Sequence, residues 1–429
     1  MNAALSYSNP ADPGPAPSIA QSASRLAINR VTLSNFRCYD TLRLDAKAGL
    51  IILTGANGAG KTNLLEALSL LSPGRGLRGA RLAEIYRRSD ASPQASDRQI
   101  TNTHSTDLPA ADKSAHLPAA EASAKWGVAA EFATPNGALS IGVGWAEADG
   151  ERRAVRVNGT AVSGQTALSE HVSMVWLTPA MDRLFVEAPS GRRRFLDRLV
   201  FAVDPAHAGR LQAYDKARRE RARLLRDMRV DDSWLGALER NMAERAVAIA
   251  AARLDLIERL RQAIGEESGS FPRPEIAMRG VIEDWLEQRP ALEVEDKYRA
   301  ALQQARARDG ESGTCEGVHR SDLTARLSVS GPQAEQASTG EQKAILISLI
   351  LAHGRLLARL KGRVPVLLLD EITAHLDGAR RQALFEAIED LGAQAWLTGT
   401  DKSLFEPLRQ DGQFYTVAKG GTLQQDDYG

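Results

Sequence analysis

The chain has 429 residues, 43% of them hydrophobic and 25% charged, and its 54 Lys and Arg balance its 54 Asp and Glu. This length accommodates two or three domains with a sizeable core, and zero net charge means that any nucleic-acid surface must be local. No apolar run approaches the roughly 18 residues of a membrane span, so we expect no transmembrane segment. Cys38 and Cys315 are too few for a disulfide framework or a zinc site. We interpret them as unpaired thiols in a reducing cytoplasm.

The first 25 residues are rich in Ala, Ser and Pro and lack a basic start followed by an apolar block. This composition predicts a disordered tail rather than a signal peptide. Residues 28–33 are predicted to form a strand, Asn35-Phe36-Arg37-Cys38-Tyr39 a turn, and Leu42 and Leu44 continue the alternation. A hairpin that leads into the next strand is the simplest account.

Residues 50–71 carry the most specific motif. Leu50-Ile51-Ile52-Leu53 predicts a buried strand, and the leucine spacing of residues 63–71 predicts a helix. Between them, residues 55–62 match the phosphate-binding loop pattern of glycine, four residues, glycine-lysine-threonine. Glycines let the backbone curl, so that successive N–H groups and the helix N-terminus point at phosphate oxygens. We therefore expect ATP to bind at Gly55, Ala56, Asn57, Gly58, Ala59, Gly60, Lys61, Thr62 and Asn63.

Two side chains of this loop have chemical roles. We expect Lys61 to reach the β- and γ-phosphates and to take part in catalysis, and the Thr62 hydroxyl to ligate Mg²⁺. After the helix, Arg75, Arg78 and Arg81 stand in a glycine-rich stretch. They could hold phosphate of ATP or DNA, or they could be solvated, and the sequence leaves both open.

Residues 89–124 are rich in Ser, Ala, Asp, Pro and Thr, and we predict a disordered insertion. Alternating residues then predict further strands, with Asn158-Gly159 as a turn signal. These strands are expected at residues 128–132, 139–145, 154–157 and 172–177.

A long helical region begins after Pro189. Residues 206–228 and 233–267 predict an antiparallel helical hairpin, at most about 50 Å long at roughly 1.5 Å per residue. Residues 271–308 are expected to pack back along it. Residues 191–230 contain twelve Lys or Arg against five Asp or Glu with few aromatics, which favours contact with the DNA backbone over base stacking. The candidate DNA contacts are Arg218, Arg219 and Arg221; the alternative is an ordinary solvated helix face.

The last third predicts a return to the nucleotide-binding part. Its expected elements are strands at 323–329, 364–369 and 395–398, helices at 340–360 and 380–391, and a closing hairpin at 414–423. Asp370 and Glu371 follow the apolar run 366–369, at the strand end where ligands bind in open α/β sheets. We expect Asp370 to hold the Mg²⁺ shell and Glu371 to polarise the attacking water. Two acids that merely cap a turn are the alternative.

Ser338-Thr339-Gly340-Glu341-Gln342 opens the helix at 340–360. Small residues and free N–H groups at a helix start form an anion site. Because the chain already has one phosphate-binding loop, this second site suggests that Ser338, as a catalytic residue, and Gly340 meet a γ-phosphate from another subunit. A serine that only caps its helix is the alternative.

The order of phosphate loop, serine-glycine signature, Asp370-Glu371 strand and Leu376-Asp377 is similar to that of ABC-type ATPases. Asn35-Phe36-Arg37 resembles their DNA-repair branch, which includes the SMC proteins. Three further stretches closely resemble the RecF family, and they are Arg192-Arg193-Arg194-Phe195-Leu196-Asp197, Gly317-Val318-His319-Arg320-Ser321-Asp322-Leu323 and Asp370-Glu371-Ile372-Thr373-Ala374-His375-Leu376-Asp377.

The resemblance implies an α/β ATPase head of ABC type, made of residues 26–188 and 317–429, with a short helical arm at 189–316. It implies a cytoplasmic protein that forms a homodimer on ATP, binds double-stranded or gapped DNA and hydrolyses ATP slowly with stimulation by DNA. It further implies that such a protein helps to load recombinase at single-stranded gaps together with the mediator RecR.

The chain also departs from the family pattern. Val318 stands where proline is usual, Ser321 where aspartate is usual, and Glu341 where glutamine is usual. Residues 398–401 offer no histidine, and residues 178–182 offer no glutamine as a Mg²⁺ sensor, for which Asp182 is the candidate substitute.

Two rival functions follow from these features. One is the ATPase subunit of a membrane transporter, which the missing histidine and glutamine and the basic arm disfavour. The other is a scaffold that binds ATP without significant hydrolysis, which Glu371 disfavours.

Overall fold

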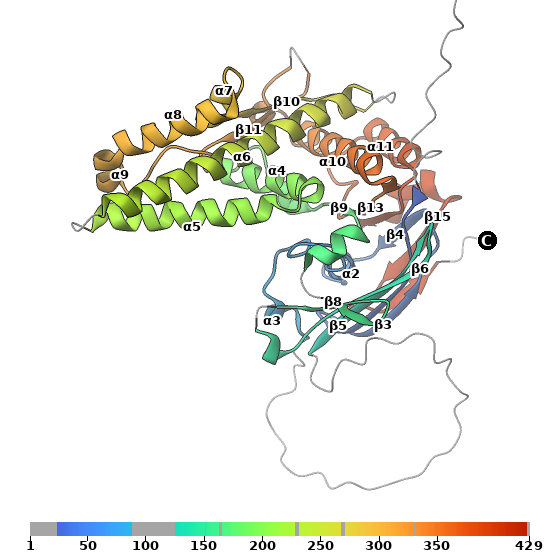
Figure 1. The fold of residues 1–429 in the computed structure, drawn as a ribbon. Helices are drawn as coiled ribbons and strands as arrows, with labels where there is room; N and C mark the ends of the chain where they lie inside the picture. Colours follow the sequence, from blue (N-terminus) through green and yellow to red (C-terminus); the bar gives the residue numbers. More distant parts are fainter. Residues whose placement is uncertain are drawn as a thin grey trace, which may run out of the picture.

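The computed structural model describes residues 24–87, 125–150, 152–162, 165–227, 231–266, 271–328 and 331–426. Figure 1 shows a head that contains the sheets and an elongated helical arm that projects from it. The expected insertion at 89–124 and most of the expected tail lie outside the described residues. Within the expected tail, β1 (Ser24–Arg25) is ordered, because it pairs in parallel with β12 (Arg363–Val364).

One sheet of the head is antiparallel, with strand order β3-β2-β5-β6-β7-β8. Its strands are β2 (Ala27–Phe36), β3 (Tyr39–Asp45), β5 (Trp126–Thr134), β6 (Gly137–Trp145), β7 (Ala154–Val157) and β8 (Thr160–Val162). Asn158 and Gly159 have φ of 50° and 79° and join β7 to β8, which confirms the predicted turn. Buried and half-buried residues alternate along β5, as expected of a strand with one face on the core.

The second sheet has the order β16-β15-β4-β14-β13-β9 and is parallel except for its last pair, β15 and β16. Its strands are β4 (Leu50–Thr54), β9 (Met174–Leu177), β13 (Val366–Leu369), β14 (Ala395–Gly399), β15 (Gly412–Val417) and β16 (Leu423–Gln425). The residues of β4, β9, β13 and β14 are all buried, which explains their continuous apolar runs.

The parallel sheet separates two apolar cores. Ile51 and Leu53 face a core shared with α2 (Lys61–Ser69) and the antiparallel sheet. Leu50 and Ile52 face the other core, which α10 (Thr339–Lys361), α11 (Gly378–Leu391) and the base of the arm complete. Alternate residues of a strand point to opposite faces, so one short apolar run serves both cores.

Shorter head segments are α3 (Leu82–Ile85), η1 (Glu147–Asp149), η2 (Gln165–Glu170), η3 (Pro179–Met181), η4 (Ala334–Gln336) and η5 (Lys402–Leu408).

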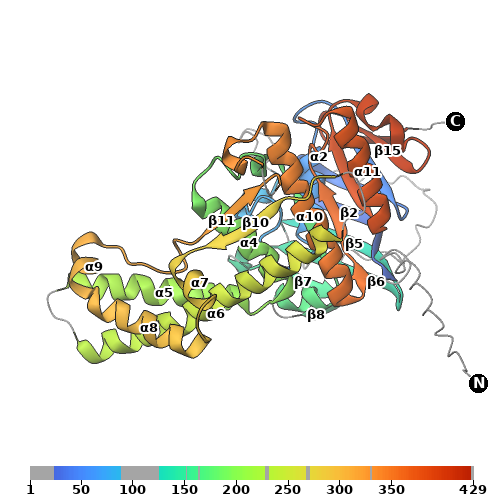
Figure 2. The same cartoon turned by 90° about the horizontal axis from the view of Figure 1, so that it is seen from above.

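The arm is a bundle of helices seen edge-on in Figure 1 and from above in Figure 2. Its helices are α4 (Pro189–Val203), α5 (His207–Arg226), α6 (Asp232–Gly265), α7 (Val281–Leu286), α8 (Ala291–Gln304) and α9 (Arg306–Ser312). The helices α5 and α6 form the predicted hairpin, and α8 packs along α6. None of the described helices is long and apolar enough to cross a membrane.

The strand expected at 323–329 is present at Asp322–Arg326, where it pairs with a segment that follows α6. The strand β11 (Asp322–Arg326) does not join the sheet of the phosphate loop; it pairs in antiparallel fashion with β10 (Glu275–Arg279) in a separate two-stranded sheet. Its apolar face packs against the base of the arm, where Leu323 and Met278 share one core. The chain therefore re-enters the parallel sheet only at β13.

One ion pair joins the arm to the head, and a second links the arm helices α4 and α6. Arg192 donates to both carboxylate oxygens of Asp322, at 2.7 and 2.8 Å, and Arg253 donates to both of Asp197, at 2.8 and 2.9 Å. Burial opposes ionisation of Asp197, but hydrogen bonds from His207 and Arg253 outweigh it and lower its pKa. The family-like stretches at 192–197 and 317–323 thus meet here, and Arg192, Asp197 and Asp322 are held in ion pairs.

Candidate nucleotide-binding site

The loop Gly55–Thr62 lies between β4 and α2, in the predicted strand–loop–helix context. Gly55, Gly58 and Gly60 have φ of 141°, 78° and 123°, in the region that favours glycine. A Cβ on Gly55 would lie 2.3 Å from the Val417 carbonyl oxygen, so that position has no room for a side chain. The glycines therefore serve both the curl of the loop and its close approach to β15.

Lys61 is folded over the loop. Its ammonium donates to the carbonyl oxygens of Gly55 and Ala56 at 2.6 and 3.1 Å and lies 3.5 Å from the Glu371 carboxylate. The side chain is only 4% exposed, so its charge is held by these few partners. A bound phosphate could take over the donors that the loop carbonyls now occupy.

Thr62 and Asp370 meet at the end of the loop. The Thr62 hydroxyl donates to the Asp370 carboxylate at 2.9 and 3.0 Å, and the Thr398 hydroxyl donates to the same carboxylate at 2.7 Å. Asp370 follows β13, and β14, which carries Thr398, lies between β13 and β4. Parallel strands thus deliver their carboxyl ends to one edge of the sheet. The result is a cluster of hydroxyl and carboxylate oxygens, the donor set that Mg²⁺ prefers.

Glu371 sits in a strained backbone conformation, with φ of 48°. Its N–H donates to the Thr398 hydroxyl at 2.8 Å, and its carbonyl accepts from Lys343 at 2.8 Å. Non-glycine residues in this region are uncommon and need support from their surroundings. Thr398 and Lys343 supply that support, and the carboxylate is left facing Lys61.

Asp182 is held by Lys343. The ammonium of this lysine, 1% exposed on α10, lies 3.3 Å from the Asp182 carboxylate. Burial raises the pKa of Asp182, and the charge of Lys343 limits the rise. The preceding residues 178–181 line a cleft of about 610 Å³ together with Thr62 and Asp370. The loop predicted to sense Mg²⁺ therefore lies near the oxygen atoms of Thr62 and Asp370, although the Asp182 carboxylate itself pairs with Lys343 of α10.

Ser338 caps α10. Its hydroxyl accepts from the Glu341 N–H at 3.4 Å, while the Glu341 carboxylate accepts from the Ser338 N–H at 2.8 Å. These hydrogen bonds lower the pKa of Glu341, and the alternative considered from the sequence, a serine cap, is thus realised within one chain. A Cβ on Gly340 would lie 2.8 Å from the His375 carbonyl oxygen, so glycine is required there. Within the described residues, no hydrogen bond or ion pair links Ser338 or Gly340 to residues 55–62, and their predicted role toward a γ-phosphate stays a prediction.

A group of residues beside the loop helix was not predicted. Glu66, 2% exposed on α2, pairs with Arg37 at 2.7 Å and with Arg78 at 2.9 Å. Arg78 also donates to the Asn63 side chain at 2.9 Å. Arg37 and Arg78 therefore brace α2, while Arg78 also lines the cleft that contains Thr62 and Asp370, so its role toward phosphate stays open.

The predicted DNA contacts separate into two kinds. The prediction that Arg221 contacts DNA is wrong, because this arginine is 2% exposed. It pairs with Glu239 at 3.0 Å and with Asp309 at 2.9 Å inside the arm. Helical periodicity turns this arginine inward, where two carboxylates compensate its charge. Arg219 is exposed, and Arg218 contacts Asp215 at 3.4 Å, so both remain candidates.

The residues that sequence reasoning missed are Lys343, Thr398 and Glu66. In the sequence, Lys343 is a lysine five residues after Ser338, Thr398 is a threonine at the carboxyl end of a strand, and Glu66 is an acid in the helix after the phosphate loop. Each is a common feature, and only the fold gives it a partner.

A parallel sheet with a phosphate loop, an Asp-Glu pair at the end of another strand of that sheet and a helical arm defines an ATPase head of the RecF/RecN/SMC type. In agreement, the family described as "RecF/RecN/SMC N terminal domain" matches residues 27–421. The chain is 44% identical over 397 residues to the DNA replication and repair protein RecF of Mesorhizobium japonicum, covering 92% of this chain and 96% of that one. It is 42% identical to RecF of Brucella suis biovar 1, covering 94% and 97%. The chain belongs to the RecF family of DNA replication and repair proteins.

The fold agrees with solved structures of that family. The structure of "the recombination mediator protein RecF-ATPrS in RecFOR pathway" has a TM-score of 0.76 at 21% identity and covers 95% of this chain and 100% of its own. The corresponding RecF-ATP structure has a TM-score of 0.73 at 22% identity, covering 94% and 99%. The predicted ABC-type head with a helical arm is thereby confirmed as the fold.

Proposed function

We propose that this protein binds ATP with Mg²⁺ in a homodimer, uses that dimer to hold DNA, and hydrolyses ATP slowly to release it. The observation that carries the proposal is the junction of the phosphate loop with Asp370, where Thr62 donates to the carboxylate at 2.9 Å. Relatives described as ATP-bound RecF support the nucleotide.

The phosphate loop would bind the phosphates of ATP, and Thr62 and Asp370 would bind the metal ion. The N–H groups of residues 55–62 and the start of α2 would bind phosphate oxygens, and Asn63 would follow them on the helix. Lys61 would exchange its loop carbonyls for the β- and γ-phosphates. Thr62 and Asp370 would hold Mg²⁺ by two oxygens, since this ion usually takes few protein ligands and completes its shell with water and substrate phosphates. The ion would neutralise charge on the phosphates.

Glu371 would orient the attacking water. Its carboxylate is held beside the loop by backbone bonds to Thr398 and Lys343, at a distance of 3.5 Å from Lys61. A carboxylate fixed in this way is placed to polarise water at the γ-phosphate. This geometry favours an enzyme over the scaffold without hydrolysis.

Ser338 and Gly340 would complete the site of a second copy. The first N–H groups of a helix lack helical partners and can bind an anion, and at the start of α10 they lie next to Ser338 and Gly340. The phosphate loop of each chain would bind one ATP. The start of α10 would reach the γ-phosphate of an ATP that is bound to the loop of a second, facing chain. ATP would then join two heads.

DNA would contact the cleft between head and arm. The cleft measures about 710 Å³, and Arg75, Arg81 and Arg153 line it with no carboxylate among the described residues of its wall. Arg153 is 8% exposed, its Nε and Nη1 have no partner among the described residues, and burial lowers its pKa to about 10. A phosphate in the cleft would compensate this charge. Arg218 and Arg219 would extend the surface along α5.

The cytoplasm is the proposed compartment, and the family relationship makes a RecR-like mediator and a recombinase at single-stranded gaps the proposed partners. A membrane-bound partner is not favoured, because the relatives are DNA replication and repair proteins.

Light scattering with and without ATP tests the dimer. Ser338→Arg should bind ATP and stay monomeric, whereas Glu371→Gln should accumulate the dimer because ATP is no longer consumed. Ser338→Asn is the matched control, since asparagine is an equally good helix cap, adds no charge and is much smaller than arginine. Normal dimerisation of Ser338→Arg would exclude the shared site.

Salt-dependent DNA binding tests the cleft. Replacing Arg75 and Arg81 together with alanine should reduce the salt slope by about 0.9 for each lost phosphate contact. The control exchanges the exposed Arg289 and the half-buried Arg299 of the arm, which lie outside the cleft, and removes the same charge. An equal loss in both double variants would mean that only net charge matters.

A further inference from the structure

Lys343 connects three parts of the head that are far apart in the chain. It lies in α10, and its side chain is 1% exposed. Its ammonium donates to the Glu371 carbonyl oxygen at 2.8 Å and lies 3.3 Å from the Asp182 carboxylate. Glu371 follows β13 and Asp182 follows η3, so one buried side chain holds both of these loops against α10.

The backbone of Glu371 depends on two hydrogen bonds. Its φ of 48° is unusual for a residue with a side chain, and this angle sets the direction in which the carboxylate leaves the chain. The Glu371 N–H donates to the Thr398 hydroxyl at 2.8 Å, and the carbonyl accepts from Lys343 at 2.8 Å. The contact with Lys343 therefore helps to set the direction of the Glu371 carboxylate.

Two lysines lie on either side of Glu371. The ammonium of Lys61 lies 3.5 Å from the Glu371 carboxylate, and under the proposed function it moves to the phosphates of ATP. Lys343 remains in place, because it is buried and bonded to the Glu371 backbone. Burial lowers the pKa of Lys343, while the charges of Asp182, Glu371 and Asp370 oppose this shift. Lys343 thus supplies a fixed positive charge beside three acids when Lys61 is engaged with phosphate.

The stability of the fold gives little reason for a lysine at this position. Burying an ammonium costs free energy, and replacing buried ionic groups by apolar side chains of similar volume is often neutral or stabilising. Methionine has a similar shape and no charge. Both partners of Lys343 belong to loops beside the nucleotide site, so a role in that site accounts for the lysine.

We propose that Lys343 is a positioning residue for ATP hydrolysis. It holds the Glu371 backbone so that the carboxylate faces the attacking water, and it holds residues 178–182 beside Thr62 and Asp370. Lys343 acts through Glu371 and Asp182 and needs no contact of its own with the nucleotide. The inference rests on the proposed function, because it takes Glu371 as the residue that orients water.

Hydrolysis and ATP binding, measured separately, test this role. Lys343→Met should lower kcat at least about tenfold, because catalysis falls steeply when a reacting group is misplaced by a fraction of an ångström. The Kd for ATP should stay within about twofold of wild type, since Lys343 lies outside the phosphate loop. Lys343→Arg keeps the charge and the donors and should restore part of the lost kcat. A wild-type kcat in Lys343→Met, or a loss of ATP affinity as large as the loss of kcat, would overturn the proposal.

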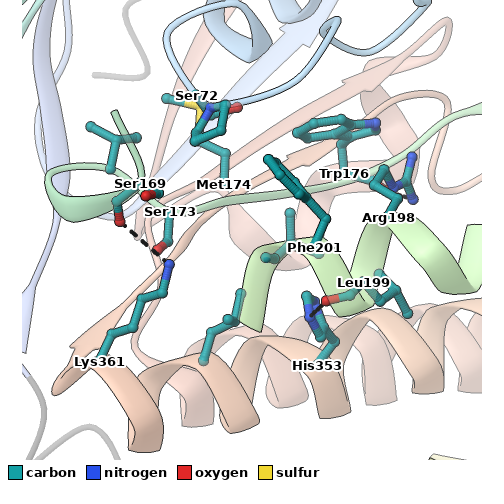
Figure 3. A pocket seen from close by; sticks show the side chains of 15 residues that line it. Ser72, Ser169, Ser173, Met174, Trp176, Arg198, Leu199, Phe201, His353 and Lys361 are labelled. Carbon is teal, nitrogen blue, oxygen red and sulfur yellow. Dashed lines mark hydrogen bonds between the residues drawn. The ribbon is translucent and has the colours of Figure 1, made fainter. Parts of the chain in front are cut away.

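Lys361→Met is the matched control. Lys361 lies in the last turn of the same helix, and its ammonium lies 3.5 Å from the Ser169 carbonyl oxygen (Figure 3). The substitution removes the same charge from α10 at the end away from the nucleotide site, so kcat should stay at the wild-type value. An equal fall of kcat in Lys361→Met and Lys343→Met would mean that only the charge of the helix matters.

Hydrogen exchange of the full chain without nucleotide tests the contact independently of hydrolysis. In Lys343→Met the amides of residues 178–182 and 371–375 should exchange at least about tenfold faster, while β4 keeps its wild-type rates. Lys343→Gln removes the charge and shortens the side chain, and it serves for both measurements if Lys343→Met does not fold. Absence of hydrolysis in the wild type would reject the proposed function, whereas unchanged exchange in both segments would overturn the role of Lys343.

Discussion

Thr62 and Asp370 are 308 positions apart in the chain, and the threonine hydroxyl donates to both carboxylate oxygens of the aspartate at 2.9 and 3.0 Å. This contact joins the end of the phosphate loop to the end of β13. The same two side chains supply the oxygens proposed for Mg²⁺. The contact that positions the loop against β13 therefore also places the two proposed metal ligands together.

The first prediction follows from this contact. In Asp370→Asn the amide oxygen can still accept from Thr62 and Thr398, but the negative charge that attracts the metal is lost. We expect ATP binding in EDTA to stay close to wild type, while the gain on adding Mg²⁺ falls by about tenfold or more, equivalent to roughly 1.4 kcal/mol. Fluorescent-nucleotide titration with and without Mg²⁺ measures both values.

Asp377→Asn is the matched control for this variant. Asp377 caps α11 by accepting from the Arg380 N–H at 2.8 Å, and asparagine is an equally good cap. The control should keep the full Mg²⁺ effect. An undiminished Mg²⁺ effect in Asp370→Asn would remove Asp370 from the metal site.

The second prediction concerns Arg221, which pairs with the buried carboxylates of Glu239 and Asp309. Arg221→Ala removes the buried arginine from Asp309 and leaves Glu239 with Arg306 alone, and breaking a buried ion pair typically costs about 3–5 kcal/mol. Arg219→Ala, two positions away on the exposed face, should leave stability nearly unchanged. Denaturant unfolding monitored by circular dichroism distinguishes the two. Equal stability of both variants would contradict the buried network.

These arginines also indicate what the sequence can and cannot predict. Residues 55–62 were identified in the correct context because a phosphate loop is local and its chemistry fixes its residue types. The strand before Asp370 was found because a central parallel strand is a continuous apolar run. Arg221 was misassigned because charge counts along a helix ignore which face is buried, and its partner Asp309 lies 88 positions away.

Long-range pairing limits sequence reasoning in other places too. The strand β11 was predicted, but its partner β10 belongs to a segment without a clear strand pattern, so their pairing could not be predicted. Lys343 and Thr398 support Glu371 through its backbone, and no residue type is specific for such a role. The charged residues of 192–197 were noticed by resemblance, and only the fold assigns them to ion pairs.

The third prediction uses His353, whose pKa is lowered to about 3 by burial. The pKa of the unfolded ring is about 6.5. Between about pH 3 and pH 6.5 the unfolded state therefore binds a proton at this histidine, and the folded state does not. Stability is thus fully present above about pH 6.5 and falls as the pH drops, by up to about 1.4 kcal/mol per pH unit from this group. His353→Gln can keep a donor to the Leu199 carbonyl and should flatten the slope between pH 6.5 and 4.5. Chemical unfolding across this range measures it, and identical slopes in both proteins would exclude a neutral buried His353.

The last prediction tests whether two chains share each ATP site. Lys61→Met should lose tight ATP binding without unfolding, because among the described residues the Lys61 ammonium is bonded to carbonyls of the loop and to Glu371. Ser338→Arg should bind ATP and fail to dimerise. Neither variant alone should hydrolyse ATP in the presence of DNA.

When the two variants are mixed, both lesions fall on the same composite site of a mixed dimer, since Ser338 of one chain would face Lys61 of the other. The second site is then built from the intact Lys61 of one chain and the intact Ser338 of the other. We therefore expect DNA-stimulated hydrolysis to recover in part, in proportion to the mixed dimers. The control mixes Lys61→Met with Glu371→Gln. Glu371 lies 3.5 Å from Lys61 of its own chain, so this pair leaves each site of the mixed dimer with one lesion and should stay inactive. Recovery in the control, or its absence in the test mixture, would mean that the sites are not shared as proposed.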